Sequence, residues 1–390
     1  MSRGDAAGYA CALGIMTGTS ADGADAALVT VERGPAPRRT RLIAWHHQGY
    51  SPALRERVLG AQEGTLAMRD LLALHVELGR HAALAAGGAL RAKEAAGFMP
   101  EVVGLHGQTV FHDPQGKRSG IPLSIQIGEP TVVAHALGCR VVSNFRMSDI
   151  LEGGEGAPLV PRFDLNQFVS EASDRVLLNL GGIANLTRLK PAARVEDVIA
   201  FDCGPGNMLL DAIMASVGPH GSRFDAEGAQ AARGEAAEEV VEEFLADPFI
   251  ARRPPKSAGR EEFGAAYLER FLARTATLSL PDRMRTAVEI TAGAVARGVA
   301  LSGSGRPDEV LVSGGGALNR TLLGALGRAL PASRLLTSET LGVPVLAKEA
   351  MAFAFLAFET ISGRPGNVPS ATGARKEVVL GSVTPAPRPR

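Results

Sequence analysis

The sequence predicts an α/β protein of two domains, and three observations support this prediction. The chain has 390 residues, more than one hydrophobic core usually holds. Hydrophobic residues make up 45% of it, which is ample for packed cores. Short apolar segments and longer helical segments also alternate in two successive sets of similar order, which indicates a duplicated domain with a cleft between the halves. A single doubly wound domain is the alternative, but no GxGxxG follows an early strand.

The first set opens with a hairpin, because two apolar runs flank a polar turn rich in glycine. The next long stretch is rich in Ala, Leu and Glu with helical periodicity and reads as two helices. The expected strands are 13–16, 24–31, 42–47, 102–106, 124–127 and 140–143, and the expected helices lie within 51–96 and begin at 130.

The second set begins near residue 175 with another short strand that ends at two glycines. A second strand can pair with it as a hairpin, and helices and strands then alternate. The expected strands are 176–180, 185–189, 198–202 and 309–312, and the expected helical segments are 208–216, 226–280 (broken at 252–255), 287–302, 318–330 and 347–361.

Composition narrows the class of partner. Lys plus Arg and Asp plus Glu both number 41, so the formal charge is zero and neither a nucleic acid nor a membrane surface is indicated. A small-molecule substrate fits this balance better. The three cysteines, without CxxC spacing, predict reduced thiols in a cytosolic protein. We find no signal peptide and no run of 18 apolar residues, and we expect the Pro/Arg-rich tail 384–390 to be disordered.

A glycine-bearing loop joins the first two strands and is predicted to grip phosphates. Its glycines free the backbone, while its N–H groups and hydroxyls can donate to phosphate oxygens. Its two aspartates, Asp22 and Asp25, could hold Mg²⁺ through water. A tight hairpin turn with capping hydroxyls is an equally good interpretation. The predicted nucleotide contacts are Gly18, Thr19, Ser20, Ala21, Asp22, Gly23, Ala24 and Asp25.

A second loop, Asp202-Cys-Gly-Pro-Gly-Asn207, follows another expected strand. A carboxylate at a strand end, followed by two glycines, places a base beside open backbone amides, so Asp202 is the candidate base. We predict that Gly204, Gly206 and Asn207 contact the nucleotide. Alternatively Asp202 caps the following helix. Asn207 is nearer the helix start and could serve as that cap, which would leave Asp202 free.

The third loop, Ser313-Gly-Gly-Gly316, follows a wholly apolar strand. Gly314, Gly315 and Gly316 would let a flat ring approach the backbone, and Asn319 could cap the next helix. A plain strand-to-helix turn explains this motif equally well when it is taken alone.

Further polar residues stand at other strand exits. His106, Gln108 and Thr109 could hydrogen-bond a sugar or a carboxylate, and no Cys or Asp is spaced for a catalytic triad or a zinc site. Arg146 could grip an anionic group with its planar fork, although a surface salt bridge is the commoner role. Glu349 precedes an apolar helix, where the helix dipole alone would favour it.

Eight motifs occur in collinear order between about residues 13 and 374: Thr17-Gly-Thr-Ser-x-Asp-Gly-x-Asp25, His106-Gly-Gln-Thr109, Gln126-Ile-Gly128, Gly156-Ala-Pro-Leu-Val-Pro161, Leu178-Asn-Leu-Gly-Gly-Ile-Ala-Asn-Leu-Thr187, Phe201-Asp-Cys-Gly-Pro-Gly-Asn207, Ser313-Gly-Gly-Gly316 and Glu349-Ala-Met-Ala-Phe353. In this combination they resemble the 1,6-anhydro-N-acetylmuramic acid kinase family. Three departures stand out: Thr17 replaces a usual Ser, Asn144 replaces a common Asp, and residues 115–121 lengthen a loop.

The resemblance implies two actin-like or ribonuclease H-like domains of mixed sheets flanked by helices, with a nucleotide cleft between them. The lobes would be residues 10–145 with 346–378, and residues 146–345. The implied enzyme uses ATP and Mg²⁺. It opens the anhydro ring of the sugar with water and phosphorylates O6, in cytoplasmic cell-wall recycling, and it is a homodimer.

The resemblance also implies site roles. Asp202 is the base that activates water, residues 18–25 bind ATP, and Arg146 and Glu349 match sugar-site positions. Two alternatives remain: another sugar or acyl kinase of the same fold, and a non-catalytic nucleotide-binding protein. Asp202 argues against the second, because a binding module needs no base.

Overall fold

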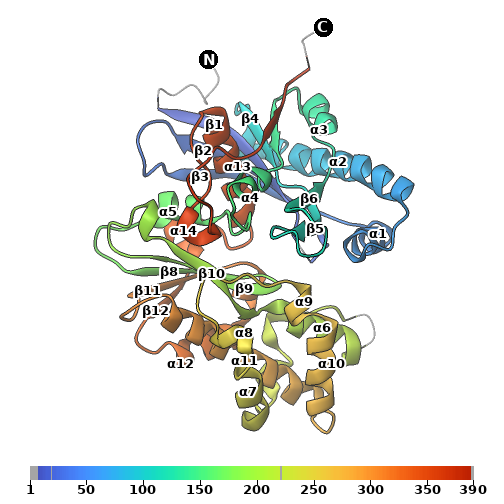
Figure 1. Cartoon of the computed structure of the whole chain (residues 1–390), viewed down its shortest axis with the longest axis vertical. Helices are drawn as coiled ribbons and strands as arrows, with labels where there is room; N and C mark the ends of the chain where they lie inside the picture. The colour runs from blue at the N-terminus through green and yellow to red at the C-terminus, as the bar shows by residue number, and fades with distance from the viewer. Residues whose placement is uncertain (1–7, 19, 220–221, 388–390) are drawn as a thin grey trace. The chain divides into compact units, whose positions relative to one another are not determined.

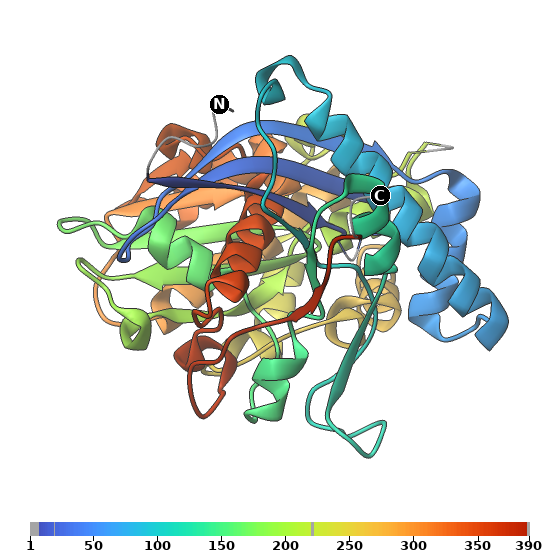
Figure 2. The same cartoon turned by 90° about the horizontal axis from the view of Figure 1, so that it is seen from above.

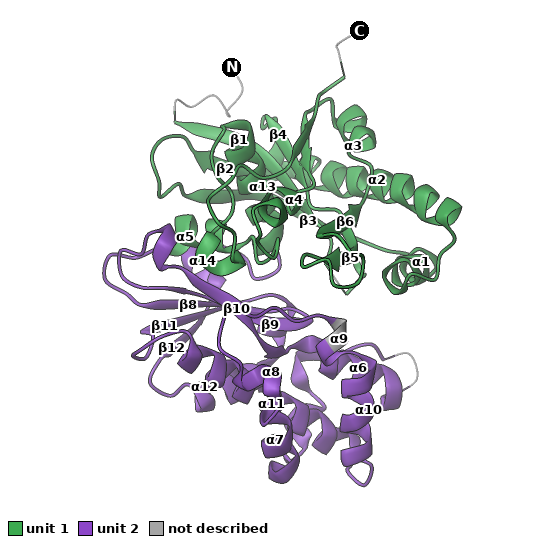
Figure 3. Cartoon of the chain, viewed as in Figure 1, with its two compact units in different colours: residues 1–168, 347–390 green, residues 169–346 purple. Residues whose placement is uncertain are grey.

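The computed structural model describes residues 8–18, 20–219 and 222–387, and of residues 260 and 261 the backbone alone. The chain divides into two compact units (Figure 3). Unit 1 comprises Met1–Phe168 and Ala347–Arg390, and unit 2 comprises Val169–Leu346. The last part of the chain thus returns to the unit in which the chain began.

Residues 146–168 belong to unit 1, whereas the sequence analysis placed them in the second lobe. The reason is a set of hydrogen bonds around Asp149, whose side chain is fully buried. Its Oδ1 accepts from Asn367 Nδ2 and from Thr372 Oγ1, each at 2.7 Å. These bonds tie the segment to the returning C-terminal part of the chain. No local sequence pattern predicts such a contact between residues far apart in the chain.

Unit 1 is built on a six-stranded mixed sheet in the order β13-β7-β4-β1-β2-β3. Figure 1 labels four of these strands, β1 to β4. The strands β1, β2 and β3 form an antiparallel meander, and β1, β4 and β7 run parallel. The predicted hairpin is confirmed, with Tyr9 opposite Glu32 and Met16 opposite Asp25. The strands are β1 (Tyr9–Met16), β2 (Gly23–Glu32), β3 (Thr40–Gly49), β4 (Val102–Leu105), β7 (Val141–Ser143) and β13 (Ser382–Thr384).

Helices α2 and α13 cover opposite faces of this sheet, as the view from above shows (Figure 2). Cys11, Leu13 and Ile15 pack with the alanines of α2, while the alternate residue Gly14 faces α13. The helices of unit 1 are α1 (Pro52–Glu63), α2 (Met68–Leu90), α3 (Pro130–Leu137), α4 (Met147–Leu151), α5 (Pro161–Phe168), α13 (Lys348–Ile361) and α14 (Pro369–Thr372).

Two glycines let α13 lie directly on the sheet. A Cβ on Gly14 would stand 1.9 Å from the carbonyl oxygen of Ala350, and one on Gly104 would stand 2.2 Å from that of Phe353. Any larger residue would push the helix away. The close approach carries the first turn of α13 to the end of the sheet at which β1 and β4 finish.

A separate two-stranded arm projects from unit 1. Strands β5 (Gln108–Asp113) and β6 (Leu123–Ile127) pair antiparallel. The loop that joins them is held by Asp113, whose carboxylate accepts from the N–H groups of Lys117, Arg118 and Ser119. The residues 115–121 noted in the sequence therefore form an ordered turn at the tip of this arm.

Unit 2 is built on a five-stranded mixed sheet in the order β10-β9-β8-β11-β12. Strands β8, β11 and β12 run parallel, and β9 is antiparallel to both β8 and β10. No residue of the short edge strand β12 is fully buried, and no strand was predicted there. The strands are β8 (Arg175–Leu180), β9 (Ile183–Leu189), β10 (Ile199–Pro205), β11 (Glu309–Ser313) and β12 (Arg334–Thr337).

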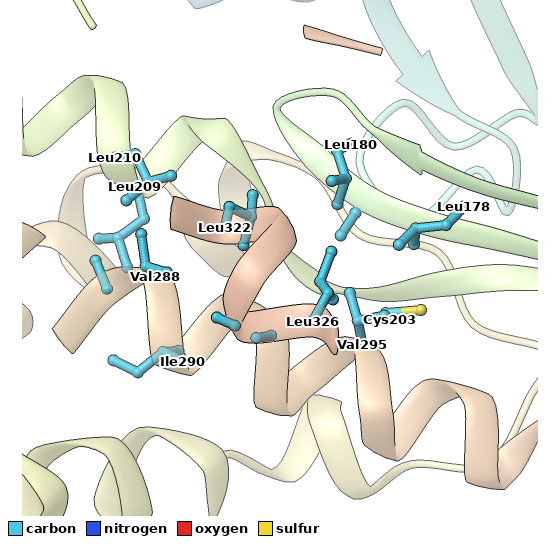
Figure 4. Packing of buried hydrophobic residues seen from close by; sticks show 14 of the residues in the cluster. Leu178, Leu180, Cys203, Leu209, Leu210, Val288, Ile290, Val295, Leu322 and Leu326 are labelled. Carbon is cyan, nitrogen blue, oxygen red and sulfur yellow. The ribbon is translucent and has the colours of Figure 1, made fainter. Parts of the chain in front are cut away.

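Helices pack on this sheet around one large hydrophobic core, which includes Cys203 of β10, Val295 of α11 and Leu326 of α12 (Figure 4). Cys203 lies against Gly298 of α11. The segment predicted as one broken helical stretch forms four α-helices and two short 3-10 helices, Ala226–Gly228 and Ala231–Arg233. Ser279 caps the long helix α11, which has a proline in its first turn. The helices are α6 (Asn207–Val217), α7 (Glu238–Leu245), α8 (Pro248–Ala251), α9 (Arg260–Phe263), α10 (Ala265–Arg274), α11 (Leu280–Leu301) and α12 (Arg320–Ala329).

These two α/β units, each with a mixed sheet and packed helices, confirm the predicted fold class and exclude a single doubly wound domain. All three cysteines are free and buried. Within the described ranges, no helix has the length and apolar character needed to cross a membrane. Thr384 ends strand β13, so the tail expected to be disordered from residue 384 starts with a residue paired to Val141.

Candidate active site

The parallel strands of unit 1 bring the predicted residues His106 and Arg146 and the start of the first glycine loop to one edge of the sheet. Thr17 follows β1, His106 follows β4 and Arg146 comes shortly after β7. Carboxyl ends of parallel strands are where ligands bind in open α/β sheets. The sequence-predicted residues of these three loops therefore share the expected edge.

His106 and Arg146 are in direct contact. Nη2 of Arg146 lies 2.7 Å from Nε2 of His106, and its Nη1 donates to the carbonyl oxygen of Gly156 at 2.8 Å. Burial and the charge of Arg146 lower the pKa of His106 well below its usual value. A guanidinium can only donate, so Nε2 accepts and the neutral ring carries its proton on Nδ1. Burial also lowers the pKa of Arg146, to about 10.

Glu349 lies in the first turn of α13 and completes this group. Burial raises the pKa of its carboxyl, as do the charges of Asp25 and Asp164, while Lys348 and Arg146 oppose the shift. Lys348 is engaged elsewhere, in a buried ion pair with Asp164 at 3.0 Å. The side chain of Glu349 makes no hydrogen bond among the described residues. The structure thus leaves a carboxyl group available beside the Arg146 guanidinium.

Gln108 holds the glycine loop rather than standing free. Its Nε2 donates to the carbonyl oxygen of Gly18 at 3.0 Å, and its Oε1 accepts from the hydroxyl of Tyr50 at 3.4 Å. The amide is engaged at both ends, which indicates a bracing role for Gln108. Thr109 is half-buried, and its Oγ1 accepts from Gln126 Nε2 at 3.4 Å. A sugar contact by either residue stays a prediction.

The first glycine loop has one feature that fits an anionic ligand. Thr17 is buried, and its Oγ1 has no hydrogen-bond partner within the described structure. Leaving a buried hydroxyl unpaired is unfavourable, so a phosphate oxygen here would satisfy it. Ala21 turns the chain with φ 51°, and Gly23 and Ala24 already lie in β2. Thr19 lies outside the described residues.

The two aspartates predicted to hold magnesium differ in their surroundings. Asp25 Oδ1 lies 3.1 Å from Nδ1 of His47, and this hydrogen bond raises the pKa of His47. Asp22 is exposed. The described residues contain no group of three or more metal-binding side chains. Magnesium beside phosphates keeps several waters and needs one or two carboxylates, so the pair fits a water-mediated site.

In unit 2, Asp202 stands on β10 next to a bulge and is held by another segment. The N–H of Ala258 donates to its Oδ2 at 2.7 Å. Burial raises the pKa of Asp202 to about 7, with the Ala258 bond and the charge of Lys256 opposing and Glu262 adding to the rise. A carboxylate with a pKa near the working pH suits general-base chemistry.

Neither Asp202 nor Asn207 caps the helix after the second loop. The residue before α6 is Gly206, which offers no side chain, and Asn207 is already helical. Its Nδ2 donates instead to the carbonyl oxygen of Leu180 at 3.0 Å. The prediction that Asn207 caps α6 is therefore wrong, because the side chain bridges to the end of β8. The inference that Asp202 is free of a capping role is confirmed.

The backbone amides of this loop are also occupied. The N–H groups of Gly206 and Asn207 donate to the carbonyl oxygens of Gly182 and Gly181, at 2.9 and 2.8 Å. A Cβ on Gly206 would stand 2.4 Å from the carbonyl oxygen of Gly181. The expectation of open amides here is wrong for these two groups, since Gly206 is required for close packing of backbone on backbone.

The third loop meets the second through Asn207. A Cβ on Gly316 would stand 3.1 Å from Asn207 Oδ1, and one on Gly315 would stand 3.5 Å from its Nδ2. Gly314 has φ 82°, which favours glycine, and Gly315 is exposed. The prediction that Asn319 caps the next helix is confirmed, with Leu322 N–H donating to its Oδ1 at 2.9 Å.

Sequence reasoning missed two residues near these groups. Lys256, buried next to Asp202, follows the prolines that break the predicted helix, and that break was the available signal. His112 lies on β5, and burial together with the charge of Arg146 lowers its pKa to about 4. Asp202 belongs to unit 2, and His106, Arg146 and Glu349 belong to unit 1.

Comparisons with known proteins agree over nearly the whole chain. Residues 10–386 match the family model described as anhydro-N-acetylmuramic acid kinase. A protein of that name from Gloeobacter violaceus is 40% identical over 380 residues, covering 96% of this chain and 98% of the relative. One from Caldanaerobacter subterraneus is 36% identical over 383 residues, covering 95% and 96%. A ROK family glucokinase from Streptomyces griseus, solved with glucose and AMPPNP, is a distant likeness with TM-score 0.38 and 13% identity, covering 90% of this chain and 99% of that one.

Proposed function

The chain belongs to the anhydro-N-acetylmuramic acid kinase family, and from that premise we propose its reaction. The enzyme opens the 1,6-anhydro ring of 1,6-anhydro-N-acetylmuramic acid with water and transfers the γ-phosphoryl group of ATP to O6. The products are N-acetylmuramic acid 6-phosphate and ADP. The proposed setting is cell-wall recycling in the cytoplasm, with the enzyme acting as a homodimer.

The observation that carries this proposal is the environment of Asp202. Its carboxyl has a pKa raised by burial to about 7 and one oxygen fixed by the Ala258 N–H. An ordinary kinase acceptor is a hydroxyl that is already present, whereas ring opening requires a deprotonated water. A partly buried carboxylate whose pKa is near neutral pH supplies that base.

The proposed chemistry proceeds in two bond exchanges. Asp202 takes a proton from water as the water oxygen bonds to C1, and the bond between C1 and O6 breaks. The released O6 then attacks the γ-phosphorus, ADP leaves, and Asp202 returns its proton to solvent. Positioning and electrostatics dominate the second exchange.

Residues of unit 1 support binding of an anionic sugar. The guanidinium of Arg146 is held by His106 and Gly156 and can face a carboxylate such as that of the lactyl group. The side chain of Glu349 has no hydrogen bond among the described residues and can accept from a sugar hydroxyl. We propose that these two side chains orient the sugar.

ATP is proposed to contact the glycine loop at residues 18–25 and the triple-glycine loop at Gly314–Gly316. The unpaired Thr17 hydroxyl supports the first contact, and the exposed Gly315 supports the second. Mg²⁺ bound with ATP would offset phosphate charge, and Asp22 and Asp25 would hold it through water.

The test follows the fate of solvent oxygen. Purified enzyme is incubated with the anhydro-sugar and ATP in H₂¹⁸O while ADP release is measured. We expect one ¹⁸O at C1 of the sugar product, measured immediately after turnover and corrected for exchange in a control of unlabelled product. Absence of label above that control would refute ring hydrolysis. ADP release at an equal rate with ordinary N-acetylmuramic acid would indicate a plain sugar kinase. If no sugar led to ADP release, the protein would be a non-catalytic nucleotide-binding protein.

A further inference from the structure

A short segment outside the predicted motifs holds Asp202 from two directions. We call residues 256–258 the strap. The backbone N–H of Asp202 donates to the carbonyl oxygen of Lys256 at 3.2 Å, and the N–H of Ala258 donates to Asp202 Oδ2 at 2.7 Å. The strap thus fixes both the main chain and one carboxylate oxygen of Asp202, while Oδ1 accepts no hydrogen bond from the described residues.

The strap is itself anchored by the side chain of Lys256. Its Nζ donates to the carbonyl oxygens of Phe249 and Ile250 in α8, at 2.8 and 3.0 Å. Nζ also lies 4.8 Å from the ring centre of Phe249 and 5.6 Å from that of Phe201, the residue before Asp202. The side chain is only 6% exposed. A lysine this buried is rare and requires such partners.

The other end of the strap is closed by a second contact. The N–H of Gly259 donates to Glu262 Oε2 at 2.9 Å, which turns the chain into α9. The strap therefore has fixed points on both sides, α8 through Lys256 and α9 through Glu262.

We infer that Lys256 is a positioning residue for Asp202: it anchors the strap on α8 and so sets the direction of the carboxylate oxygen that takes the proton from water. This inference rests on the proposed function, in which Asp202 is the base. The commonest role of a buried lysine, stabilising its own loop, is also served by these bonds, so the test must separate orientation and charge from folding.

The charge of Lys256 makes it possible to distinguish positioning of Asp202 from a purely structural role. Among the described side chains, the titratable groups that interact with Asp202 are Lys256, Glu262 and Cys203. Lys256 favours the ionised carboxylate, while burial and Glu262 oppose it. Burial and the charge of Arg252 lower the pKa of Lys256 itself, and Asp202 and Cys203 oppose that shift. Removing the ammonium should therefore raise the pKa of Asp202, so that the base becomes available only at higher pH.

The experiment compares kcat against pH for the full-length enzyme and four variants. Lys256→Gln can still donate to the carbonyl groups but lacks the charge, Lys256→Met lacks both, and Lys256→Arg keeps the charge. Lys190→Gln is the matched control, because it removes an amine that donates to Asp174 and to the Ser304 carbonyl in the same unit.

We expect the acidic limb of the profile to move to higher pH in the Gln and Met variants, and to stay in place in the Arg variant and the control. The Met variant should also lose up to about 100-fold in kcat at neutral pH, because a small misplacement of a reacting group is this costly. KM for ATP should change little.

The inference would be overturned if the acidic limb of the pH profile and the value of kcat were both unchanged in the Lys256→Gln and Lys256→Met variants. Ala258→Pro leaves Lys256 in place but removes the N–H that donates to Asp202, so it tests the strap even if changes at 256 prevent folding. It should move the limb in the same direction, and an unmoved limb would count against the strap. Asp202→Asn separates the two proposals. If the Asp202→Asn variant is fully active, Asp202 is not the base. If it is inactive and the pH profiles of the Lys256 variants match that of the wild type, only the role of Lys256 is refuted.

Discussion

Arg146 places Nη2 2.7 Å from Nε2 of His106, and this one bond fixes the tautomer of the imidazole. The ring stays neutral because burial and the neighbouring charge both oppose its protonation. The guanidinium in turn is held in plane by the His106 ring and by the Gly156 carbonyl. The end of β4 thereby orients the cation that follows β7.

We expect Arg146→Lys to raise KM for the anhydro-sugar by about 10- to 100-fold, since a hydrogen bond to a charged group contributes about 1.5–3 kcal/mol. Lysine keeps the charge but cannot hold the planar fork between His106 and a ligand. Steady-state kinetics with each substrate varied would show it, with KM for ATP nearly constant. Arg140→Lys, at an exposed arginine bound to the Glu101 carbonyl, is the control. Equal sugar affinity in both variants would remove Arg146 from the site.

Asp202→Asn should make the protein more stable at alkaline pH while it abolishes turnover. The unfolded carboxyl ionises near about pH 4, whereas the folded one keeps its proton until about 7. The folded state binds more protons between these values, so stability falls as pH rises through that window. Asparagine escapes this loss, which is on the order of 4 kcal/mol for a pKa raised from about 4 to about 7. Thermal melts should coincide for both proteins below about pH 4 and separate above about pH 7. A wild type as stable as the variant at high pH would contradict the raised pKa.

Asn207→Ala should weaken ATP binding by about tenfold, the loss expected for roughly one buried hydrogen bond. The side chain bonds the Leu180 carbonyl and packs against Gly315 and Gly316, so its loss loosens the triple-glycine loop. Nucleotide titration by calorimetry measures this. Asn319→Ala is the matched control: it removes the cap of α12 and should cost about 1 kcal/mol in stability with ATP affinity retained.

Gly104→Ala should destabilise unit 1 by about 1–3 kcal/mol, because the added methyl group overpacks the contact between β4 and α13. Its carbon would stand 2.2 Å from the Phe353 carbonyl oxygen, so the helix must shift. Gly327→Ala, on α12 with no atom within 4 Å of the added carbon, should instead stabilise the protein slightly. Denaturant titration of both variants measures the change in the free energy of unfolding. Equal unfolding midpoints would contradict the prediction and show that α13 shifts without loss of stability.

The sequence predicted what local patterns control. Apolar runs ending in glycine marked the strands β1, β10 and β11. The predicted end of β10 at Asp202 is wrong, because the strand continues past it to Pro205. The cap at Asn319 was visible because capping is a matter of a few neighbouring residues. Asp202 stood out as a carboxylate at a strand end.

What could not be predicted depends on contacts between distant segments. Lys256 reaches Asp202 only after α8 folds against β10, and the proline break before Lys256 marks a loop without showing this contact. Asn207 looked like a cap because its position suited one, yet the Leu180 carbonyl competes successfully for its amide. Residues 146–168 join unit 1 through hydrogen bonds to Asn367 and Thr372, far along the chain.

The return of the C-terminal segment to unit 1 orders events during synthesis on the ribosome. Unit 2 is one uninterrupted stretch, Val169–Leu346, and its residues emerge before unit 1 is complete. Unit 1 must wait for α13, which covers the face of β1 and β4, and for β13, which pairs with β7. Its first half is translated with an apolar sheet face still open. The nascent chain is therefore most exposed to aggregation while unit 2 is being made, which is the stage at which a chaperone would matter most.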